Sequence, residues 1–268
     1  MQPNILNSRG ILNPQVAEKK FQISRHSPAQ DLAYFVERYW IIHWDLRGQP
    51  PYMQETLPYP CVNLAIEKDR SGVFGVSTGK FARLLEEKGM VFGVKFRPGA
   101  FYPFVQWPVS RITNGSMLLQ DAFGVDANPL ETTILALDDN DKMIERVECF
   151  LRERLPEQDE NVSLINQIVD YIIAHPEITR VDEVVSRLNL NKRALQRLFS
   201  QYVGVSPKWV IQRYRLHEAV EKLDNGQIVD WPKLALELGY FDQAHFIKDF
   251  KTIVGRTPGE YARHIRLT

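Results

Sequence analysis

The spacing of apolar positions changes along the chain and separates a first part that predicts strands from a second part that predicts helices. In residues 31–97, short apolar and aromatic runs alternate with Gly, Pro and Asp, which is typical of strands joined by turns. We expect a turn of helix leading into a strand within 31–47, a brief helix at 100–105, and an extended arm before residue 28. Further strands are expected at 52–56, 61–67, 72–76, 81–85 and 90–97. Many short strands favour a small barrel or sandwich.

From residue 128 onward the apolar spacing is helical. One apolar stripe lies opposite charged positions and consists of Met143, Ile144, Val147, Phe150, Leu151 and Leu155. The default expectation is that this stripe packs within its own domain, and contact with a second copy is the alternative. The polar stretch 156–161 has no period and predicts a domain boundary. The expected fold class is α+β, with a small β-barrel or sandwich and trailing helices in 1–156, and an all-α domain in 162–268.

A short motif occurs twice in the second domain. It reads Phe, three residues, then Val-Gly-x-Ser/Thr-Pro, and its copies cover residues 199–207 and 250–258. Glycine suits the left-handed end of a helix because it has no Cβ. The Ser or Thr can cap the following helix, with Pro at its first position, and Glu260 completes a capping box with Thr257. Each copy therefore predicts the end of one helix and the start of the next, within a helix-turn-helix unit.

In the first unit we expect a supporting helix at 180–188 and a recognition helix at 192–202. Asp182 is expected to bond back to the start of the supporting helix, and Asn191 to cap the recognition helix. Helical spacing turns Leu195, Leu198, Phe199 and Tyr202 toward the core and leaves Arg193, Gln196 and Arg197 outward. Arginine can pair with guanine and glutamine with adenine in the major groove. For each of the three, a surface side chain without a role is the alternative.

In the second unit, Asp230 is expected to cap a helix at 231–238 and Asp242 a recognition helix that ends near 253. The core positions are Phe246, Phe250 and Ile253. The residues expected to face DNA are Gln243, Ala244, Ile247 and Lys248, with His245 beside them.

The segment from about 162 to 268 resembles the DNA-binding domain of the AraC/XylS family of bacterial transcription regulators. The resemblance is carried by Ala235, Leu238-Gly239-Tyr240, Asp242-Gln243-Ala244-His245-Phe246, Phe250-Lys251 and Val254-Gly255-Arg256-Thr257-Pro258. It implies two recognition helices in successive major grooves, with further contacts to DNA expected at Asn191, Lys192, His245 and Lys251. The family usually has serine and arginine where this chain has Ala244 and Lys248. Since lysine lacks the planar fork of arginine, the second unit is expected to read bases more weakly or to contact phosphate.

Charge is balanced overall but not along the chain. Lys plus Arg and Asp plus Glu both number 33, so net charge gives no sign of nucleic acid. Between Glu183 and Glu218, however, the charged residues are Arg187, Lys192, Arg193, Arg197, Lys208, Arg213 and Arg215. This stretch predicts phosphate contact, and a solvated basic face is the alternative. A connecting helix at 207–223 would span roughly 25 Å, against about 34 Å between grooves on one face of DNA. One chain can thus cover a site of two turns if the DNA bends, and a homodimer would extend it.

The first domain resembles the cupin-like sensor domains that are fused to such modules, through Tyr39-Trp40, Leu57-Pro58 and the run 96–100. The resemblance implies a small-molecule effector of unknown identity. A barrel lined by Trp40, Trp44, Phe74 and Phe96 could hold it, although core packing explains the same aromatic residues. Arg97 is expected either to neutralise an acidic ligand or to pair with Glu55.

No metal or cofactor is expected, because His43 is followed by Trp44 and Asp45 and not by the His-x-His pair of metal-binding cupins. Phosphate loops, nucleophile elbows and zinc-protease motifs are absent from the sequence. Two cysteines and no apolar run of signal or membrane-spanning length favour a cytoplasmic protein without membrane contact.

The sequence thus predicts a regulator that binds promoter DNA under the control of its first domain. The resemblance implies that such regulators often recruit RNA polymerase. The alternatives are a cupin-like enzyme with a DNA-binding tether, and a regulator controlled by a protein partner.

Overall fold

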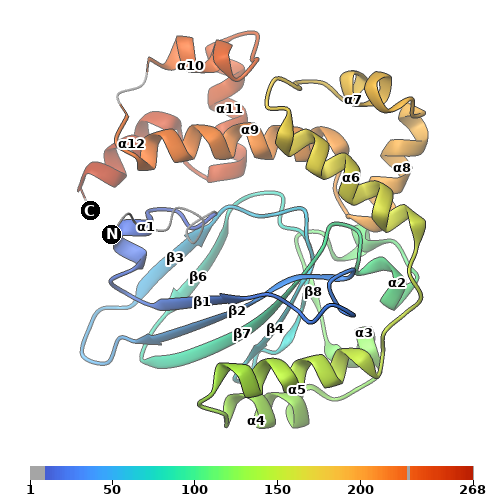
Figure 1. Ribbon diagram of the computed structural model, residues 1–268. Coiled ribbons are helices and arrows are strands. Elements are labelled where there is room, and N and C mark those ends of the chain that lie inside the picture. Colours follow the sequence, from blue (N-terminus) through green and yellow to red (C-terminus); the bar gives the residue numbers. More distant parts are fainter. Residues whose placement is uncertain (1–9, 228–229, 268) are drawn as a thin grey trace.

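The structure, a computed structural model, describes residues 10–227 and 230–267 and contains a β-rich first domain below a helical second domain (Figure 1). Six antiparallel strands form the larger sheet, in the order β1-β2-β7-β4-β5-β8. Their bounds are β1 Gln22–His26, β2 Val36–Asp45, β7 Lys88–Phe96, β4 Asn63–Glu67, β5 Gly72–Phe74 and β8 Ser116–Met117. A second sheet pairs β3 (Tyr52–Thr56) with β6 (Phe81–Leu85). Both sheets are open, so the β-rich domain is confirmed and the closed barrel is not formed.

The expected extended arm is wrong for part of its length. Residues 22–26 form β1, which pairs along β2 with Ile23 opposite Ile42. This pairing protects the backbone groups of β2, which would otherwise lie at the sheet edge. The chain before β1 also contains the short helix α1 (Pro14–Ala17). The start of the arm, residues 1–9, lies outside the described residues.

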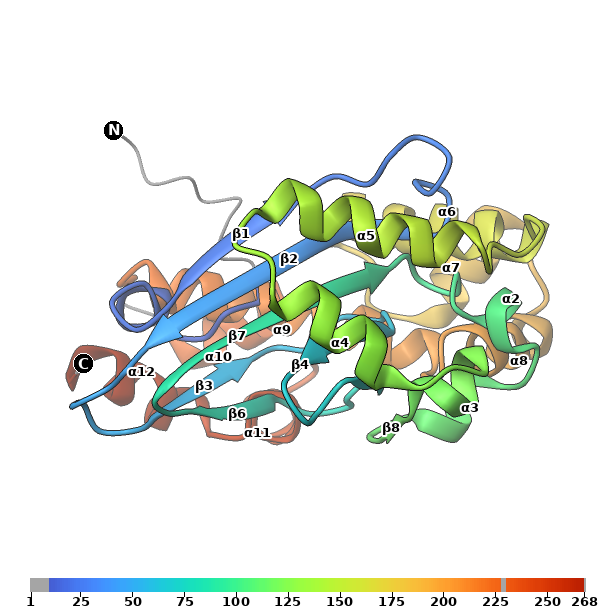
Figure 2. The ribbon, with the colours of Figure 1, turned by 90° about the horizontal axis from the view of Figure 1, so that it is seen from below.

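Helices α4 (Ala127–Leu135) and α5 (Asn140–Arg152) lie against one face of the larger sheet (Figure 2). Met143, Val147 and Leu151 of α5 are fully buried in the same hydrophobic cluster as strand residues. The default expectation for this stripe, packing within the domain, is confirmed. The shorter elements of this domain are α2 (Tyr102–Val105), the 3-10 helix η2 (Val109–Ile112) and α3 (Leu119–Phe123).

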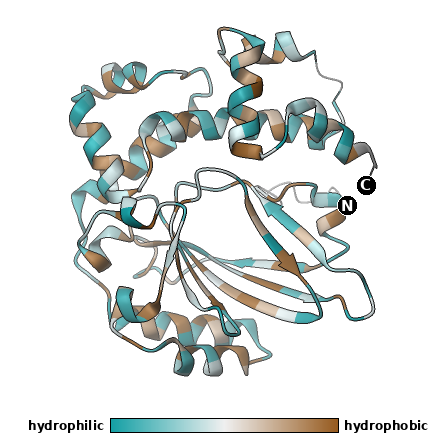
Figure 3. Cartoon of the chain, turned by 180° about the vertical axis from the view of Figure 1, so that it is seen from behind, coloured by the Kyte–Doolittle hydropathy of each residue, from teal (hydrophilic) through white to brown (hydrophobic). Residues whose placement is uncertain are grey.

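The second domain is arranged along its longest helix, α9 (Pro207–Asp224) (Figure 1). At one end of α9 lie α6 (Glu160–Ala174), α7 (Val181–Leu188) and α8 (Lys192–Tyr202). At the other end lie α10 (Trp231–Glu237), α11 (Gln243–Val254) and α12 (Pro258–Leu267). Hydrophobic and hydrophilic residues alternate around these helices in Figure 3, as expected for amphipathic helices around a core. None of the described helices has the length and apolar character needed to span a membrane.

The first helix-turn-helix unit shares its core with the β-rich domain. Leu195 and Phe199 of α8 belong to one buried cluster with Phe96 and Phe101. Polar contacts join the same surfaces: the Thr113 hydroxyl donates to the Gly204 carbonyl at 2.6 Å. A second cluster surrounds α11 and the C-terminal half of α9. The first domain contributes strand residues to the first cluster and Leu12 and Leu57 to the second, so the two units differ in how they are attached to it.

A buried carboxyl group near the end of α9 makes the second cluster sensitive to pH. Asp224 accepts a hydrogen bond from the Tyr261 hydroxyl at 2.8 Å. Burial raises the pKa of Asp224 from its ordinary value to about 6. A raised folded-state pKa means that the native protein binds a proton more tightly than the unfolded chain. Protonated Asp224 therefore contributes to the free energy of unfolding. This contribution is complete at pH below about 4 and is lost as pH rises through about 6.

We therefore expect Asp224→Asn to stabilise the protein by about 1–3 kcal/mol at pH 7.5. The amide oxygen can still accept the Tyr261 hydroxyl, and the cost of ionising a buried group is removed. Denaturant unfolding at pH 4.5 and at pH 7.5 measures the effect, which should be much smaller at the lower pH. Equal effects at both values would contradict the assignment of the pH sensitivity to Asp224.

Candidate nucleic-acid interface

The first unit has the expected helix-turn-helix form. Helix α7 ends at Asn189, whose φ of 51° is left-handed, and α8 begins after Asn191. The cap predicted at Asn191 is confirmed, because its side-chain oxygen accepts from the Ala194 amide at 3.0 Å. The turn therefore fixes where α8 starts and which of its side chains point outward.

The back-bond predicted for Asp182 is wrong, and Glu183 makes it instead. The Glu183 carboxylate accepts from the Thr179 amide at 3.0 Å and lies 3.3 Å from the Thr179 hydroxyl. Because Arg180 is the N-cap, position N3 falls on Glu183. Asp182 pairs with Lys192 at 2.7 Å, so the charge of Lys192 is engaged within the unit.

The faces of α8 divide as the spacing predicts. Leu195, Phe199 and Tyr202 are buried and Leu198 is half-buried. Arg193, Gln196 and Arg197 are exposed and lie on the opposite side of the helix. The first unit therefore presents two arginines and one amide on a rigid, capped helix, which is the donor set that reads guanine and adenine in a major groove.

In the second unit both predicted caps are confirmed. Asp230 accepts from the Lys233 amide at 3.2 Å, and Asp242 accepts from the His245 amide at 2.7 Å. The turn contains Gly239 with a φ of +68°, and a Cβ on this glycine would lie 2.3 Å from Cγ2 of Thr179. Glycine is therefore required both for the conformation and for the close packing on the first unit.

The outward face of α11 carries less charge than that of α8. Ala244, His245, Lys248 and Lys251 are exposed, whereas Gln243 and Ile247 are half-buried. Ile247 packs against the buried cluster around α11. The residues that face outward thus contain no arginine and include one alanine, which supports the expected asymmetry between the units.

The repeated motif forms the predicted helix ends. Gly204 and Gly255 have φ values of +90° and +82°. The Ser206 hydroxyl accepts from the Trp209 amide at 3.2 Å. Thr257 and Glu260 form the reciprocal capping box, with the Glu260 carboxylate 2.8 Å from the Thr257 amide. Both copies therefore act as the junction between a recognition helix and the helix that follows it.

The expected basic surface is wrong at two positions of α9. Arg213 and Arg215 are only 1% and 7% exposed, so neither can contact phosphate in this arrangement. The Arg213 guanidinium lies 4.0 Å from the centre of the Tyr59 ring, and that of Arg215 lies 4.3 Å from the Tyr240 ring. The basic residues of this stretch that remain exposed are Arg187, Lys192, Arg193, Arg197 and Lys208.

The residues predicted to bind an effector do not line one common cavity. Phe96 lies in the main core, and Trp44 lies in a separate cluster where its ring nitrogen donates to the Glu86 carbonyl at 3.0 Å. The Trp40 nitrogen lies 3.4 Å from the Asn63 side-chain oxygen, and Phe74 is half-buried on β5. Trp44 and Phe96 therefore belong to different hydrophobic clusters.

Arg97 and Glu55 do not pair with each other. Arg97 donates from Nε to the Ala33 carbonyl at 2.7 Å, while Glu55 binds both Lys80 and Arg256. Arg97 lines a cavity of about 410 Å³ between the two domains. The other lining residues include Glu37, Lys95 and Arg213. The sequence did not indicate that these three lie together, because they belong to distant segments. The described part of the chain contains no group of three or more His, Cys, Asp and Glu residues placed to hold a metal.

Comparisons with known proteins agree with this geometry. Residues 184–264 match a family described as "Helix-turn-helix domain", and residues 24–117 match "Domain of unknown function (DUF6597)". An uncharacterised HTH-type transcriptional regulator of Haemophilus influenzae is 29% identical over 32% of this chain and 29% of its own length. YtdP, an uncharacterised HTH-type transcriptional regulator of Bacillus subtilis, is 26% identical over 60% of this chain and 22% of its own length. The HTH-type transcriptional regulator MtrA of Neisseria gonorrhoeae is 26% identical over 40% of this chain and 39% of its own length.

Solved structures give partial likenesses. The C-terminal domain of AraT, a response regulator from Geobacillus stearothermophilus, is 26% identical with a TM-score of 0.34 and covers 37% of this chain and 82% of that chain. ToxT from Vibrio cholerae is 15% identical with a TM-score of 0.38 and covers 92% of this chain and 98% of that chain.

The fold and the site define a protein with two helix-turn-helix units joined by one continuous helix. Its C-terminal part is a helix-turn-helix domain of the AraC type, so the resemblance seen in the sequence is confirmed for this domain. The chain spans less than half the length of each of the three relatives described above.

Proposed function

We propose that this protein is a transcription regulator that binds specific DNA sequences and has no catalytic activity of its own. The observation that carries the proposal is the pair of capped recognition helices, α8 and α11, held by the single helix α9. Arg193, Gln196 and Arg197 are exposed on the first, and Ala244 and Lys248 on the second. DNA contact by these residues, and by Gln243, Ile247, Asn191, Lys192, His245 and Lys251, is part of the proposal.

The two units are proposed to enter successive major grooves on one face of the DNA. Helix α9 has 18 residues and a length of about 27 Å. Grooves on one face are about 34 Å apart in straight B-form DNA. Because α9 is shorter than this spacing, we expect the bound DNA to bend toward the protein. The energy needed to bend DNA depends on its base sequence, so bending adds to the sequence specificity of binding.

The first domain is proposed to sense an effector and to pass the signal through the shared core. The first unit is packed against this domain by Leu195 and Phe199, and the second is tied to it by the pair of Arg256 with Glu55. A change in the first domain would therefore act differently on α8 and on α11. Recruitment of RNA polymerase, a homodimer and location in the cytoplasm belong to the proposal as implied by the family resemblance.

Selection of bound sequences from a random DNA pool tests the proposal. A common motif of about two helical turns is expected, and recovery of unrelated sequences would contradict it. On the selected site, Arg197→Ala should cost about 1–3 kcal/mol of binding free energy and relax the preference at one base pair. Equal weakening on every sequence would mean that Arg197 touches phosphate only.

Binding to the selected site should also weaken steeply with salt. Exposed basic residues near the recognition helices replace counterions on DNA, and each contact adds about 0.9 to the slope of log K against log salt. Titrations by fluorescence anisotropy between 50 and 200 mM KCl, about the range in which such effects are large, measure this slope. A flat response would remove the nucleic-acid interpretation.

A further inference from the structure

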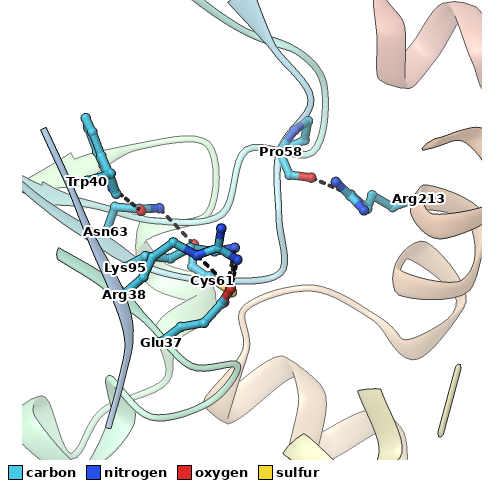
Figure 4. A network of polar contacts seen from close by, with 8 residues as sticks. All are labelled: Glu37, Arg38, Trp40, Pro58, Cys61, Asn63, Lys95 and Arg213. Carbon is cyan, nitrogen blue, oxygen red and sulfur yellow. Dashed lines mark hydrogen bonds and ion pairs between the residues drawn. The ribbon is translucent and has the colours of Figure 1, made fainter. Parts of the chain in front are cut away.

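A cavity of about 410 Å³ lies between the two domains. Its walls come from β2, β7 and the segment between β3 and β4 on one side, and from α6 and α9 on the other. Figure 4 shows the polar residues on these walls: Glu37, Arg38, Cys61 and Lys95 are grouped together, and Arg213 reaches from α9 toward Pro58. The cavity thus lies where the sensor domain meets the helix that connects the two DNA-binding units.

The inner wall of the cavity contains more positive than negative charge. The Glu37 carboxylate is shared by two cations, Arg38 and Lys95, the latter at 3.1 Å. Burial acts to raise the pKa of Glu37, but the charges of Lys95 and Arg38 outweigh it and hold the pKa below its ordinary value. One carboxylate therefore balances one of the two cations, and the other charge is left uncompensated.

Arg213 adds a second uncompensated charge. It is 1% exposed, and its Nε donates to the Pro58 carbonyl at 2.7 Å. Both Nη nitrogens lack a hydrogen-bond partner among the described residues. Two cations contact the Tyr59 ring: Lys95 Nζ lies 3.5 Å and the Arg213 guanidinium carbon 4.0 Å from the ring centre. Aromatic rings stabilise buried cations only in part, so this arrangement favours an anion beside Lys95 and Arg213.

The acidic groups of the cavity do not supply that anion. Glu218 and Glu221 have side chains that are 42% and 45% exposed, and they pair with Lys222 and His217. Asp170 is exposed on α6. These three carboxylates lie toward solvent, whereas Lys95 and Arg213 are buried.

Part of the remaining wall is apolar and consists of Val169, Ile172, Ile173, Pro176, Ile178 and Ile211. The other lining residues are Arg97, Pro98, Asn166, Tyr214, Arg215 and His217. Pockets that bind small molecules combine such a wall with a few polar groups that fix the orientation of the ligand, in volumes of about 300–1,000 Å³.

We propose that this cavity binds a small organic acid, with its carboxylate near Lys95 and Arg213 and its hydrocarbon body against the isoleucines of α6 and α9. The ligand would be the effector of the regulator, and this part of the proposal rests on the function proposed above. Because Lys95 belongs to the sensor domain and Arg213 to α9, the bound acid would neutralise charges from both domains and strengthen their contact.

Isothermal titration calorimetry on the full chain tests the site with two probes and their neutral counterparts: hexanoate against hexan-1-ol, and benzoate against benzamide. At least one carboxylate should bind with one ligand per chain and at least tenfold more tightly than its counterpart. Inorganic phosphate should bind at least tenfold more weakly, because it has no hydrocarbon body. The carboxylate that binds should also raise Tm in thermal unfolding.

Lys95→Met and Arg213→Met should each weaken binding of the carboxylate at least tenfold. Lys208→Met, which removes an exposed charge from the same helix α9, should leave binding unchanged. If Arg213→Met fails to fold, Arg213→Lys keeps the charge but loses the planar guanidinium that stacks on Tyr59, and it should bind the carboxylate more weakly than the unaltered protein but more tightly than Lys95→Met.

Four results would overturn the site: no binding of either carboxylate, neutral counterparts that bind as tightly as the acids, phosphate that binds as tightly, or carboxylate binding that survives both Lys95→Met and Arg213→Met. DNA selection on the ligand-free protein is read separately. If a DNA motif is selected but no acid binds, the effector site is wrong and the proposed DNA-binding function is supported. If an acid binds but no DNA motif is selected, the DNA-binding function is wrong and the acid-binding site is supported.

Discussion

Replacing Phe246 by alanine is expected to destabilise the second helix-turn-helix unit by about 3–5 kcal/mol, the usual cost of deleting a buried phenyl ring. Phe246 is fully buried in α11, with ring centres 5.5 Å from Tyr240 and 5.7 Å from Phe250. Its removal leaves a cavity at the centre of the cluster that holds α9, α10 and α11 together. Because the other attachments of this unit are polar, such as the hydrogen bond from Gln212 to Asp249 and the pair of Arg256 with Glu55, we expect it to unfold locally before the rest of the chain.

Phe241→Ala is the matched control for this prediction. Phe241 lies in the turn of the same unit, but its side chain is 93% exposed. Its replacement should change stability by less than about 0.5 kcal/mol. Guanidinium unfolding followed by circular dichroism, together with hydrogen exchange on α11, measures both variants. Similar losses for the two, or protection of α11 unchanged in Phe246→Ala, would show that the cluster is not what stabilises the unit.

The helix-turn-helix units were predictable because their information is local. A cap such as Asn191 or Asp242 bonds to an amide three residues later, and the buried positions of α8 recur at helical spacing. These patterns need no knowledge of distant segments. The one cap that was misplaced, on Asp182 in place of Glu183, depended on a start of α7 that shifted by one residue. Helix ends are the least certain part of any such pattern.

The environment of the cavity was not predictable, because it depends on contacts between distant segments. Arg213 follows other basic residues in the sequence and was expected to face DNA, yet its side chain lies against Tyr59 of the first domain. The aromatic residues of the strands raised a related difficulty. Trp44 lies opposite Gly89, and a Cβ on that glycine would lie 2.2 Å from the indole ring. The indole therefore packs closely on β7, which the sequence alone could not show without the strand register.

The largest expected effect on DNA binding comes from replacing Arg193 and Arg197 together by alanine. Both are exposed on the outward face of α8, one helical turn apart. If each reads a guanine, their loss should cost about 2–6 kcal/mol on the selected site. Binding to unrelated DNA should fall much less, because it depends on charge alone. The ratio of the two affinities, measured by fluorescence anisotropy at one salt concentration, gives the specificity that the first unit supplies.

Lys248→Ala provides the comparison within the second unit, and Arg187→Ala the control for charge. Lys248 is exposed on α11 and lacks the planar fork that pairs with a base, so its replacement should weaken all sequences alike and reduce the salt slope by about 1. Arg187 lies exposed on the supporting helix α7 and should behave in the same way. If Lys248→Ala instead relaxes the preference at a single base pair, the second unit reads sequence too. The asymmetry inferred from Ala244 and Lys248 would then be wrong. Loss of specificity in the Arg193 and Arg197 variant alone would instead assign sequence reading to the first unit, which shares its core with the first domain.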